Sequence, residues 1–403
     1  MIRFLTAGES HGKALTTIIE GFPSNLKIEN EYINFHLKRR QAGYGRGLRM
    51  KIETDTAEIL SGIRFQKTLG SPISLLIKNR DWENWTGKMT ADKKKSEVEK
   101  ITIPRPGHAD LVGVSKYNFN DIRNSIERSS ARETAARVAA ASIARKFLEE
   151  FGISIGSFVE SIGGIFPKSN FSKNLFENAL PKNFAGWDIS EKADKSDVRV
   201  LDVDHEKQII SKIKTAKKRG DTLGGTFFVV ATGVPLGLGS FVHYDTKLDA
   251  ELAHSIMSIN AVKAVAVGTG FECAEKFGSE SHDEIVKKGE TISRKTNRAG
   301  GIEGGTSTGL PIIVRAAMKP IATLMSPIES VNLQTMKPVD ARRERSDFVA
   351  VPACAVIAES MVAWSLAKYF LEKFGGDSIE ETKDNYKTYT QKLNKRIIKN
   401  FKV

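Results

Sequence analysis

The chain has 403 residues, of which 40% are hydrophobic and 27% charged, and its formal net charge is +13; this is the composition of an ordinary globular protein. Its first residues lack the long apolar segment of a secretory signal, and no uninterrupted apolar run approaches the roughly 20 residues that cross a bilayer, so we expect neither secretion nor a membrane partner. Cys273 and Cys354 form no CxxC pattern, which favours reduced thiols and a cytoplasmic protein.

Two apolar segments at the start of the chain, residues 1–7 and 14–22, flank the turn GESHG and are read as strands. His11 lies in this turn, where a simple hairpin would use Asn-Gly. A second glycine-bearing turn, RPGHAD at 105–110, contains His108. Histidine can donate a proton near neutral pH, so both residues are candidates for assisting the departure of a phosphate. A lone histidine, however, more often has a structural role.

The segment RRQAGYGRGLRM at 39–50 is rich in arginine and glycine and contains no lysine. A second arginine-rich segment, IERSSARETAAR, spans residues 126–137. The planar guanidinium suits two-point contacts with carboxylates and phosphates, so both segments are candidates for an anion site. Lysines are concentrated elsewhere, mainly at 93–100, at 214–221 and near the C-terminus, which predicts solvated faces rather than a site.

Further along the chain, the hydrophobic pattern predicts strands and helices without a repeating unit, and hence an α+β fold. Ser130 and Glu133 fit a capping box at the start of a long helix that Gly152 ends. A second long helix, apolar on nearly all sides, has Ser346 as its candidate cap and Gly375 as its end. The predicted strands are 68–78, 225–234, 261–268 and 310–318, and the predicted helices are 128–152, 248–259 and 345–375.

No Pro- or Ser-rich linker divides the chain, which predicts a single domain over residues 1–375. Residues 168–220 are polar and rich in lysine, and we expect them to form a surface excursion from that domain. Residues 376–403 are predicted to form a charged helical tail.

Familiar nucleotide and zinc signatures do not fit this sequence. AGESHGK is one residue short of a phosphate loop, no GxGxxG follows a strand, and the histidines are too scattered to indicate a metal site. Ser129 and Ser130 lie at the predicted start of a helix. They belong either to a phosphate-binding site or to an ordinary helix cap. The segment GGIEGGTSTG at 300–309 allows a ligand to approach closely or is a flexible loop. Asp347 is a base or simply an acid favoured at a helix start.

Taken together, the motifs resemble the chorismate synthase family. As a set they are highly specific, although no single one is. They occur in the family's order and cover approximately residues 1–370: GESHG, RRQAGYGRGLRM, SGIRFQKTLGSPISLLIKN, RPGHADL, RSSARETAARVAA, GVPLGLGS, SINAVKAVAVGTGF, NRAGGIEGGTSTG and ERSDFVAVPA.

The resemblance implies the last step of the shikimate pathway, in which 5-enolpyruvylshikimate 3-phosphate loses phosphate and a ring proton by anti-1,4-elimination to give chorismate. It also implies a requirement for reduced FMN without net redox change. The implied fold is a β-α-β sandwich with long buried helices between the sheet layers, and the implied assembly is a homotetramer. The residues by themselves indicate an anionic phosphorylated ligand and proton transfer, but not a flavin.

By this resemblance, His11 is expected to protonate the leaving phosphate, His108 to donate toward N1 of the reduced flavin, and Asp347 to act with flavin N5 in removing the ring proton. No metal is implied. The arginines expected around the substrate and the flavin are Arg40, Arg46, Arg49, Arg105, Arg132 and Arg345. The expected flavin-binding residues are Arg128, Ser129, Ser130, Asn260, Ala261, Gly304, Lys319, Pro320, Ile321, Ala322, Thr323 and Arg345.

One segment departs from the family pattern. It reads KPIAT at 319–323, where the family commonly has hydroxyl residues in the middle. Ile321 and Ala322 have no side-chain donor, so contacts there must come from the backbone. The chain also has no separate nicotinamide domain. Some family members reduce their own flavin with NADPH, but here we expect the flavin to be reduced by an outside source.

Two other readings of the sequence stay open. The net charge of +13 and the arginine-rich segments fit a basic nucleic-acid-binding protein, although aromatic residues are only 8% of the chain and those segments contain just one, Tyr44. Steep salt dependence of RNA binding would favour this reading. The chain could instead be a flavin-binding member of the family without activity, against which the presence of His11, His108 and Asp347 argues.

Overall fold

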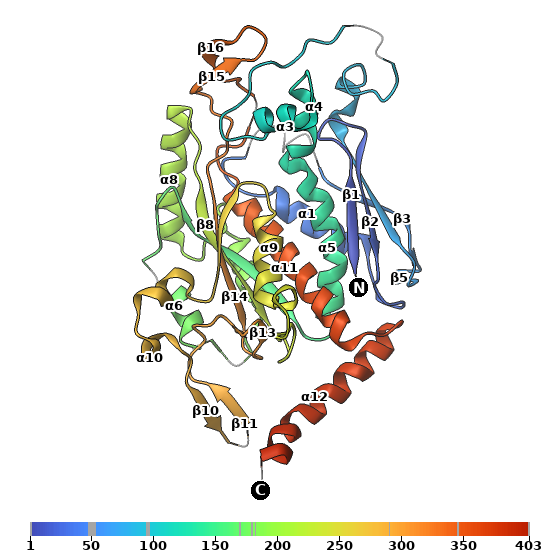
Figure 1. The fold of residues 1–403 in the computed structure, drawn as a ribbon, viewed down its shortest axis with the longest axis vertical. Coiled ribbons are helices and arrows are strands. Elements are labelled where there is room, and N and C mark those ends of the chain that lie inside the picture. Colours follow the sequence, from blue (N-terminus) through green and yellow to red (C-terminus); the bar gives the residue numbers. More distant parts are fainter. Residues whose placement is uncertain are drawn as a thin grey trace.

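The computed structural model describes residues 2–46, 54–93, 97–168, 171–178, 180, 181, 183–289, 291–344 and 346–401. Within these ranges, two four-stranded antiparallel sheets lie on either side of a group of helices (Figure 1). The first sheet is built from the N-terminal part of the chain and the second from residues that follow helix α5. The mixture of helix and sheet confirms the α+β content predicted from the sequence.

The first sheet has the strand order β1-β2-β6-β3. Alternate residues of β2 and β6 are buried, starting with Leu15 and Ile73, because successive side chains of a strand point to opposite faces. The strand predicted at 68–78 is interrupted before Ile73, where Pro72 has no N–H to donate. The bounds are β1 Arg3–Ala7, β2 Ala14–Glu20, β3 Ala57–Ser61 and β6 Ile73–Lys78, with a small hairpin of β4 Ile63–Arg64 and β5 Lys67–Thr68.

The second sheet has the order β7-β8-β14-β9. Its two strands β7 and β8 are buried almost continuously, because α11 packs on them from one side and α7 from the other. A stripe of apolar side chains such as Phe158, Phe228 and Ile189 fills the α7 side. The strands predicted at 225–234, 261–268 and 310–318 are confirmed. The bounds are β7 Ser154–Ile162, β8 Gly225–Thr232, β9 Val262–Val267 and β14 Ile312–Met318.

Four helices lie between the sheets: α1 Asn30–Gln41, α5 Thr134–Glu149, α9 Leu248–Met257 and α11 Val351–Phe374. Helix α5 packs against the first sheet and α11 against the second, and these two helices pack against each other. The alanines of α5 permit this close packing. Among the described residues, α11 is the one helix long and apolar enough to cross a membrane, and 94% of its apolar window is buried inside the protein.

The long helices begin later than their sequence signals predict. Helix α5 starts at Thr134 and follows directly on the short helix η2, Ala131–Glu133, whose N-cap is Ser130. The Ser130 side chain accepts from the Arg132 N–H at 3.3 Å, which confirms the predicted cap. The other half of the predicted capping box is wrong, because the Glu133 carboxylate accepts from Thr6 and Arg137 instead. Ser346 was a wrong choice of cap, because α11 begins at Val351 without a side-chain cap.

The segment 168–220 contains three helices, α6 Phe171–Phe176, α7 Gly186–Ala193 and α8 Val203–Arg219. Its apolar residues, among them Leu175 and Ile213, are buried in the core clusters, and its polar Arg199 is 3% exposed. Helix α12, Ile379–Phe401, forms the predicted tail and projects from the lower end of the body (Figure 1). The tail is therefore helical, as the sequence predicts.

The remaining elements are short and lie mostly at the two ends of the molecule (Figure 1). Helices α3 and α4 and the hairpin of β15 and β16 lie near one end, and the hairpin of β10 and β11 lies near the other. Their bounds are η1 Arg80–Asn84, α3 Asp110–Tyr117, α4 Arg123–Ser129, η3 Tyr244–Thr246, η4 Gly270–Glu275, α10 Gly278–Ser281, β10 Ile285–Lys288, β11 Thr291–Arg294, β12 Ile302–Glu303, β13 Thr306–Ser307, β15 Glu329–Asn332 and β16 Lys337–Asp340.

Candidate functional site

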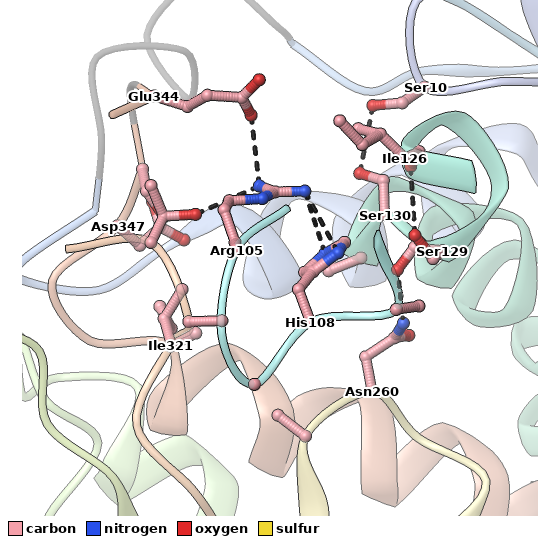
Figure 2. A pocket seen from close by; sticks show the side chains of 18 of the residues that line it. Ser10, Arg105, His108, Ile126, Ser129, Ser130, Asn260, Ile321, Glu344 and Asp347 are labelled. Atoms are coloured by element: carbon pink, nitrogen blue, oxygen red, sulfur yellow. Dashed lines mark hydrogen bonds and ion pairs between the residues drawn. The ribbon is translucent and has the colours of Figure 1, made fainter. Parts of the chain in front are cut away.

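A pocket of about 880 Å³ lies near the end of the molecule that carries α3 and α4. Its walls come from the turn between β1 and β2, helix α4, the loop before α3, the start of β9 and the segments on either side of β15 and β16. Figure 2 shows Arg105, His108 and Asp347 facing Ser10, Ser129 and Ser130 across this space. Segments far apart in the sequence thus contribute to one site.

His11 lies on the pocket wall because the turn after β1 is tied to helix α4. The turn needs glycine at position 8, where φ is +106° and a Cβ would lie 2.3 Å from the Ala14 carbonyl oxygen. The Ser10 N–H donates to the Glu127 carbonyl at 3.0 Å, and the His11 N–H donates to the Glu127 carboxylate at 2.8 Å. The imidazole is stacked on Trp85 with 4.0 Å between ring centroids.

His108 is held by a carboxylate two residues later in the chain. The Asp110 Oδ1 atom lies 2.6 Å from His108 Nδ1, and Arg105 donates from Nε to Asp110 Oδ2 at 2.8 Å. Burial raises the pKa of the Asp110 carboxyl, but the hydrogen bonds from His108 and Arg105 outweigh it and hold the pKa well below its usual range. Gly107, with φ +76°, allows the tight turn that places this cluster on the wall.

Asp347 lines the pocket from the segment that precedes α11. Its Oδ2 atom lies 3.2 Å from Nε of Arg46, which is itself behind the wall and 11% exposed in its side chain. The Phe348 N–H donates to the Gly45 carbonyl at 2.8 Å and joins the two segments. The described part of the glycine-rich arginine segment, which ends at Arg46, therefore holds Asp347 in place.

Most of the residues expected to bind flavin line the same pocket: Ser129, Ser130, Asn260, Ala261, Lys319, Pro320, Ile321, Ala322 and Thr323. The Asn260 amide donates to the Ser129 carbonyl at 3.0 Å and joins two of these segments. The Ala261 carbonyl accepts from the Lys319 N–H at 2.9 Å and joins two more. The Ile321 carbonyl accepts from Thr222 Oγ1 at 2.7 Å, so this backbone oxygen is engaged by a neighbouring residue.

Arg40 and Arg132 do not line the pocket but lie behind its wall. Both pair with the fully buried Asp55 carboxylate, Arg40 through NH1 at 3.2 Å. Arg132 also donates from Nε to the Asn79 side chain at 2.9 Å, and the Asn79 amide donates to the Gly12 carbonyl at 2.7 Å. Burial lowers the pKa of Arg40 to about 10 despite its pairing with Asp55. Arg132 therefore contacts the His11 turn through Asn79, and Arg40 is joined to Arg132 through Asp55.

Two further predicted residues lie outside the pocket. Arg128 points to the end of β1 and donates to the Thr6 carbonyl at 2.8 Å. Gly304 lies in the hairpin of β12 and β13, beside Phe241 rather than beside the pocket residues. Arg49 and Arg345 are outside the described residues, so the expectations for them stay untested.

The pocket also has polar residues that sequence reasoning did not select: Asp81, Trp85, Arg123, Lys263, Arg342, Arg343 and Glu344. Asp110 and Glu127 were missed as the partners of the two histidines. Asp110 is two residues after His108, and a carboxylate so close to a candidate histidine was an available signal. Glu127 is 116 residues from His11 along the chain, and no local pattern could have joined them.

Positive charge dominates the wall. Of the described residues that line the pocket, six are Lys or Arg and three are Asp or Glu. Such a site favours an anionic ligand. In the part of the chain that the structure describes, no three His, Cys, Asp or Glu side chains gather in a group that could hold a metal ion. Two histidines and an aspartate around one cationic pocket provide both a proton donor and a base.

Comparison with known proteins points to one family. A model of the chorismate synthase family matches residues 2–371. The chorismate synthase of Chloroherpeton thalassium is 56% identical over 397 residues, 97% of this chain and 100% of the relative. That of Aquifex aeolicus is 52% identical over 390 residues, 96% of this chain and 97% of the relative. A crystal structure of chorismate synthase has a TM-score of 0.79 at 43% identity and covers 98% of both chains. The chain belongs to the chorismate synthase family.

Proposed function

We propose that this chain catalyses the reaction of its family, the elimination of phosphate and a ring proton from 5-enolpyruvylshikimate 3-phosphate to give chorismate. The observation that carries the proposal is the meeting of His11, His108 and Asp347 on one cationic pocket. The substrate has two carboxylates and a phosphate, and such charges are too costly to bury without cationic partners. Arg105, Arg123 and Lys319 are among the described cations that can supply them.

We propose reduced FMN as the cofactor of this site. The pocket suits it chemically, because it combines apolar side chains such as Ile126 and Val262 with the hydroxyls of Ser129 and Ser130 and the ammonium of Lys319. An isoalloxazine ring needs the first kind of surface and a phosphate the second. When bound, reduced flavin supplies electron density to the substrate as the carbon–oxygen bond breaks. The residues in contact with it would be Ser129, Ser130, Asn260, Ala261 and the segment 319–323.

The roles of the chain's own residues follow from their positions. His11 donates a proton to the departing phosphate, and the neighbouring cations neutralise its charge. Asp347 is the base on which the ring proton ends. His108, which Asp110 holds through Nδ1, would donate toward the flavin. Arg40, Arg46 and Arg132 act from behind the wall through Asp55 and Asp347.

We propose a β-α-β sandwich that functions as a single domain, because one apolar cluster includes residues of both sheets and of α5 and α11. We also propose a cytoplasmic homotetramer with no nucleic-acid partner. The flavin is expected to arrive reduced, because the described residues form one continuous body without a separate nicotinamide domain.

An anaerobic assay tests the reaction. Purified protein is mixed with 5-enolpyruvylshikimate 3-phosphate and chemically reduced FMN, and chorismate and phosphate are quantified together. We expect equal release of both, and none when FMN is omitted or left oxidised. NADPH with oxidised FMN should not sustain turnover. Absence of product from folded, flavin-bound protein would refute the proposal and favour a binding function.

The same assay tests the two histidines. His11→Ala and His108→Ala should each lower kcat by about two orders of magnitude or more, the contribution typical of general acid help, while flavin still binds. His254→Ala is the matched control, because His254 is exposed on α9 and does not line the pocket. Turnover close to that of the control would remove the altered histidine from the mechanism.

A further inference from the structure

We propose that Glu127 is the positioning residue for proton transfer by His11: its carboxylate holds Nδ1, orients the ring so that Nε2 delivers the proton, and stabilises the doubly protonated ring. This inference rests on the proposed function, in which His11 protonates the departing phosphate. It assigns to the site a carboxylate that lies behind the pocket wall and does not itself line the pocket.

The contact geometry supports a fixed orientation. The two carboxylate oxygens of Glu127 lie 2.9 and 3.1 Å from His11 Nδ1. One of them also accepts from the His11 main-chain N–H at 2.8 Å. The carboxylate therefore holds both the backbone and the ring of the same residue. With Nδ1 engaged in this way, a proton that leaves the ring toward a ligand must leave from Nε2.

Packing restricts the ring further. Trp85 lies against the imidazole at 4.0 Å with 34° between the ring planes. The side chain of Glu127 is 2% exposed and that of His11 is 15% exposed, so little water competes for the contact. A hydrogen bond to a charged group in such a place contributes more than it would in water. The ring can neither tilt away from Trp85 nor rotate without losing the Glu127 contacts.

The charges around the pair favour an ionised carboxylate. Burial raises the pKa of the Glu127 carboxyl, but hydrogen bonds from the His11 side chain and main chain and the charge of Arg123 outweigh it, so the pKa is lowered. Arg123 lies one turn earlier on α4, with NH1 3.2 Å from Glu127 Oε1. Among the described residues, further charged groups near the pair include Glu9 in the same turn and Asp81 and Lys88 around Trp85.

The proton transfers balance with Asp347 as the base. As the carbon–oxygen bond breaks, its electron pair stays on the phosphate oxygen, and the Nε2 proton of His11 is transferred to that oxygen. The ring proton of the substrate passes to Asp347, and the electron pair of its carbon–hydrogen bond forms the new double bond. The imidazole is left neutral, with its Nδ1 proton still donated to Glu127, and it regains a proton from solvent. Glu127 remains ionised throughout. The carboxylate thus acts only through His11, as orienting partners of catalytic histidines do.

A purely structural role makes a different prediction. If Glu127 served only to fasten the turn to α4, its loss would lower stability and would affect kcat equally at every pH. If Glu127 stabilises the doubly protonated His11 ring, replacing Glu127 must lower kcat more at alkaline pH than at acidic pH, because fewer rings then carry the second proton. The pH dependence therefore separates the two roles.

The first experiment measures kcat and KM from pH 6 to pH 9 for wild type, E127Q, E127D and E160Q. We expect E127Q to lower kcat at pH 8 by roughly 10- to 100-fold, a part of the about 10²–10⁴-fold that a general acid contributes, with KM little changed. The loss should be smaller at pH 6. E127D keeps the charge and should retain the wild-type pH dependence. E160Q removes a carboxylate on β7 that is 10% exposed, is paired with Arg315 on β14 and does not line the pocket, and it should leave kcat unchanged.

The second experiment needs no activity. Nitrogen-15 NMR at alkaline pH shows which ring nitrogen of a neutral imidazole carries the proton. In wild type, the neutral His11 ring should carry its proton on Nδ1, which faces Glu127. In E127Q this preference for Nδ1 should disappear. Because wild type alone gives the first result, the test survives a variant that does not fold.

The outcomes are distinguishable. A kcat loss in E127Q that is the same at pH 6 and pH 8, or a loss confined to KM, would overturn the positioning role. So would a neutral His11 ring in wild type that carries its proton on Nε2. If wild type made no chorismate while the His11 proton lay on Nδ1, the proposed function would fail but the carboxylate–histidine contact would stand.

Discussion

At the scale of single residues, a second buried carboxylate stands out, in the core rather than at the site. Glu359, in the middle of α11, is 0% exposed. It accepts hydrogen bonds from the guanidinium groups of Arg39, Arg145 and Arg199 and from two serine hydroxyls. Burial raises its pKa, but the three arginines outweigh this effect and hold the pKa far below the usual range. Arg39 precedes Arg40, so the cluster also fixes the end of α1 that approaches the site.

Replacing this carboxylate should destabilise the protein. We expect E359Q to lower the unfolding free energy at pH 7 by about 3–5 kcal/mol, since three buried guanidinium groups would lose a shared counter-charge and, among the described residues, only Arg39 and Arg199 would keep a carboxylate partner, Asp194. A group with a depressed folded pKa stabilises at pH values above its unfolded pKa, about 4.3 for Glu, and loses this effect as the pH falls further. The difference between E359Q and wild type should therefore be constant above about pH 5 and shrink below about pH 4.

Denaturant unfolding at several pH values measures this difference. The control is D204N, which removes a carboxylate that is 82% exposed and paired with Lys207; it should change stability by less than about 0.5 kcal/mol. An E359Q protein as stable as this control would show that the buried cluster contributes nothing net. A difference that grew on acidification would contradict the sign of the pKa shift.

At the scale of elements, the crossing of α7 over β7 depends on two glycines. A Cβ on Gly156 would lie 2.0 Å from the Gly186 carbonyl oxygen, and a Cβ on Gly186 would lie 2.4 Å from the Ser154 carbonyl oxygen. Both contacts are with backbone atoms, which cannot rotate away. This crossing brings Ser190 and the following Asp194 to the Glu359 cluster. The segment predicted as a surface excursion is therefore linked to the centre of the molecule.

G186A should push α7 away from the second sheet. Inserting a methyl group into a packed backbone contact typically costs about 1–3 kcal/mol, and we expect a loss of stability in this range by thermal or denaturant unfolding. G87A is the matched control: no atom lies within 4 Å of its new Cβ. Equal stability of the two variants would mean that the α7 crossing adjusts without cost.

At the scale of the whole molecule, large apolar side chains remain exposed in particular places. Phe241, Val242 and Tyr244, which lie in one loop after β8, are 77%, 66% and 85% exposed. This loop lies beside Gly304, a residue expected at the flavin but found outside the pocket of a single chain. Exposed apolar groups on one loop are typical of surfaces that associate. They are compatible with the expected homotetramer.

The assembly can be measured directly. The chain has a mass of 44.4 kDa, and light scattering coupled to size-exclusion chromatography should give four times this mass. Y244E, which introduces a charge into the exposed loop, should reduce the assembled mass if the loop is buried between copies. Y117E is the control, because Tyr117 is 62% exposed on α3, at the pocket end of the molecule. A monomeric wild type would refute the tetramer.

The sequence by itself determined most of the local elements and pointed to several residues that line the pocket. The strands at 225–234, 261–268 and 310–318 were predictable because their apolar pattern is continuous, and the ends of the long helices because glycine follows each. His11, His108 and Asp347 could be selected because they occur in distinctive motifs. Ser130 could be predicted as a cap, but the short helix η2 between it and Thr134 could not, because a capping signal does not distinguish a 3-10 turn from an α-helical one.

The tertiary structure alone decided which residues meet. Glu127 and His11 are 116 residues apart, and Asp55 and Arg132 are 77 apart, yet each pair is in direct contact. Such contacts depend on how two sheets and four helices pack, which local patterns do not encode. For the same reason, Arg40 and Arg132 could be predicted to lie near the site, but only the packing shows that they lie behind its wall. A motif specifies the chemistry that a side chain can perform, whereas its partner, and so its role, follows from the fold.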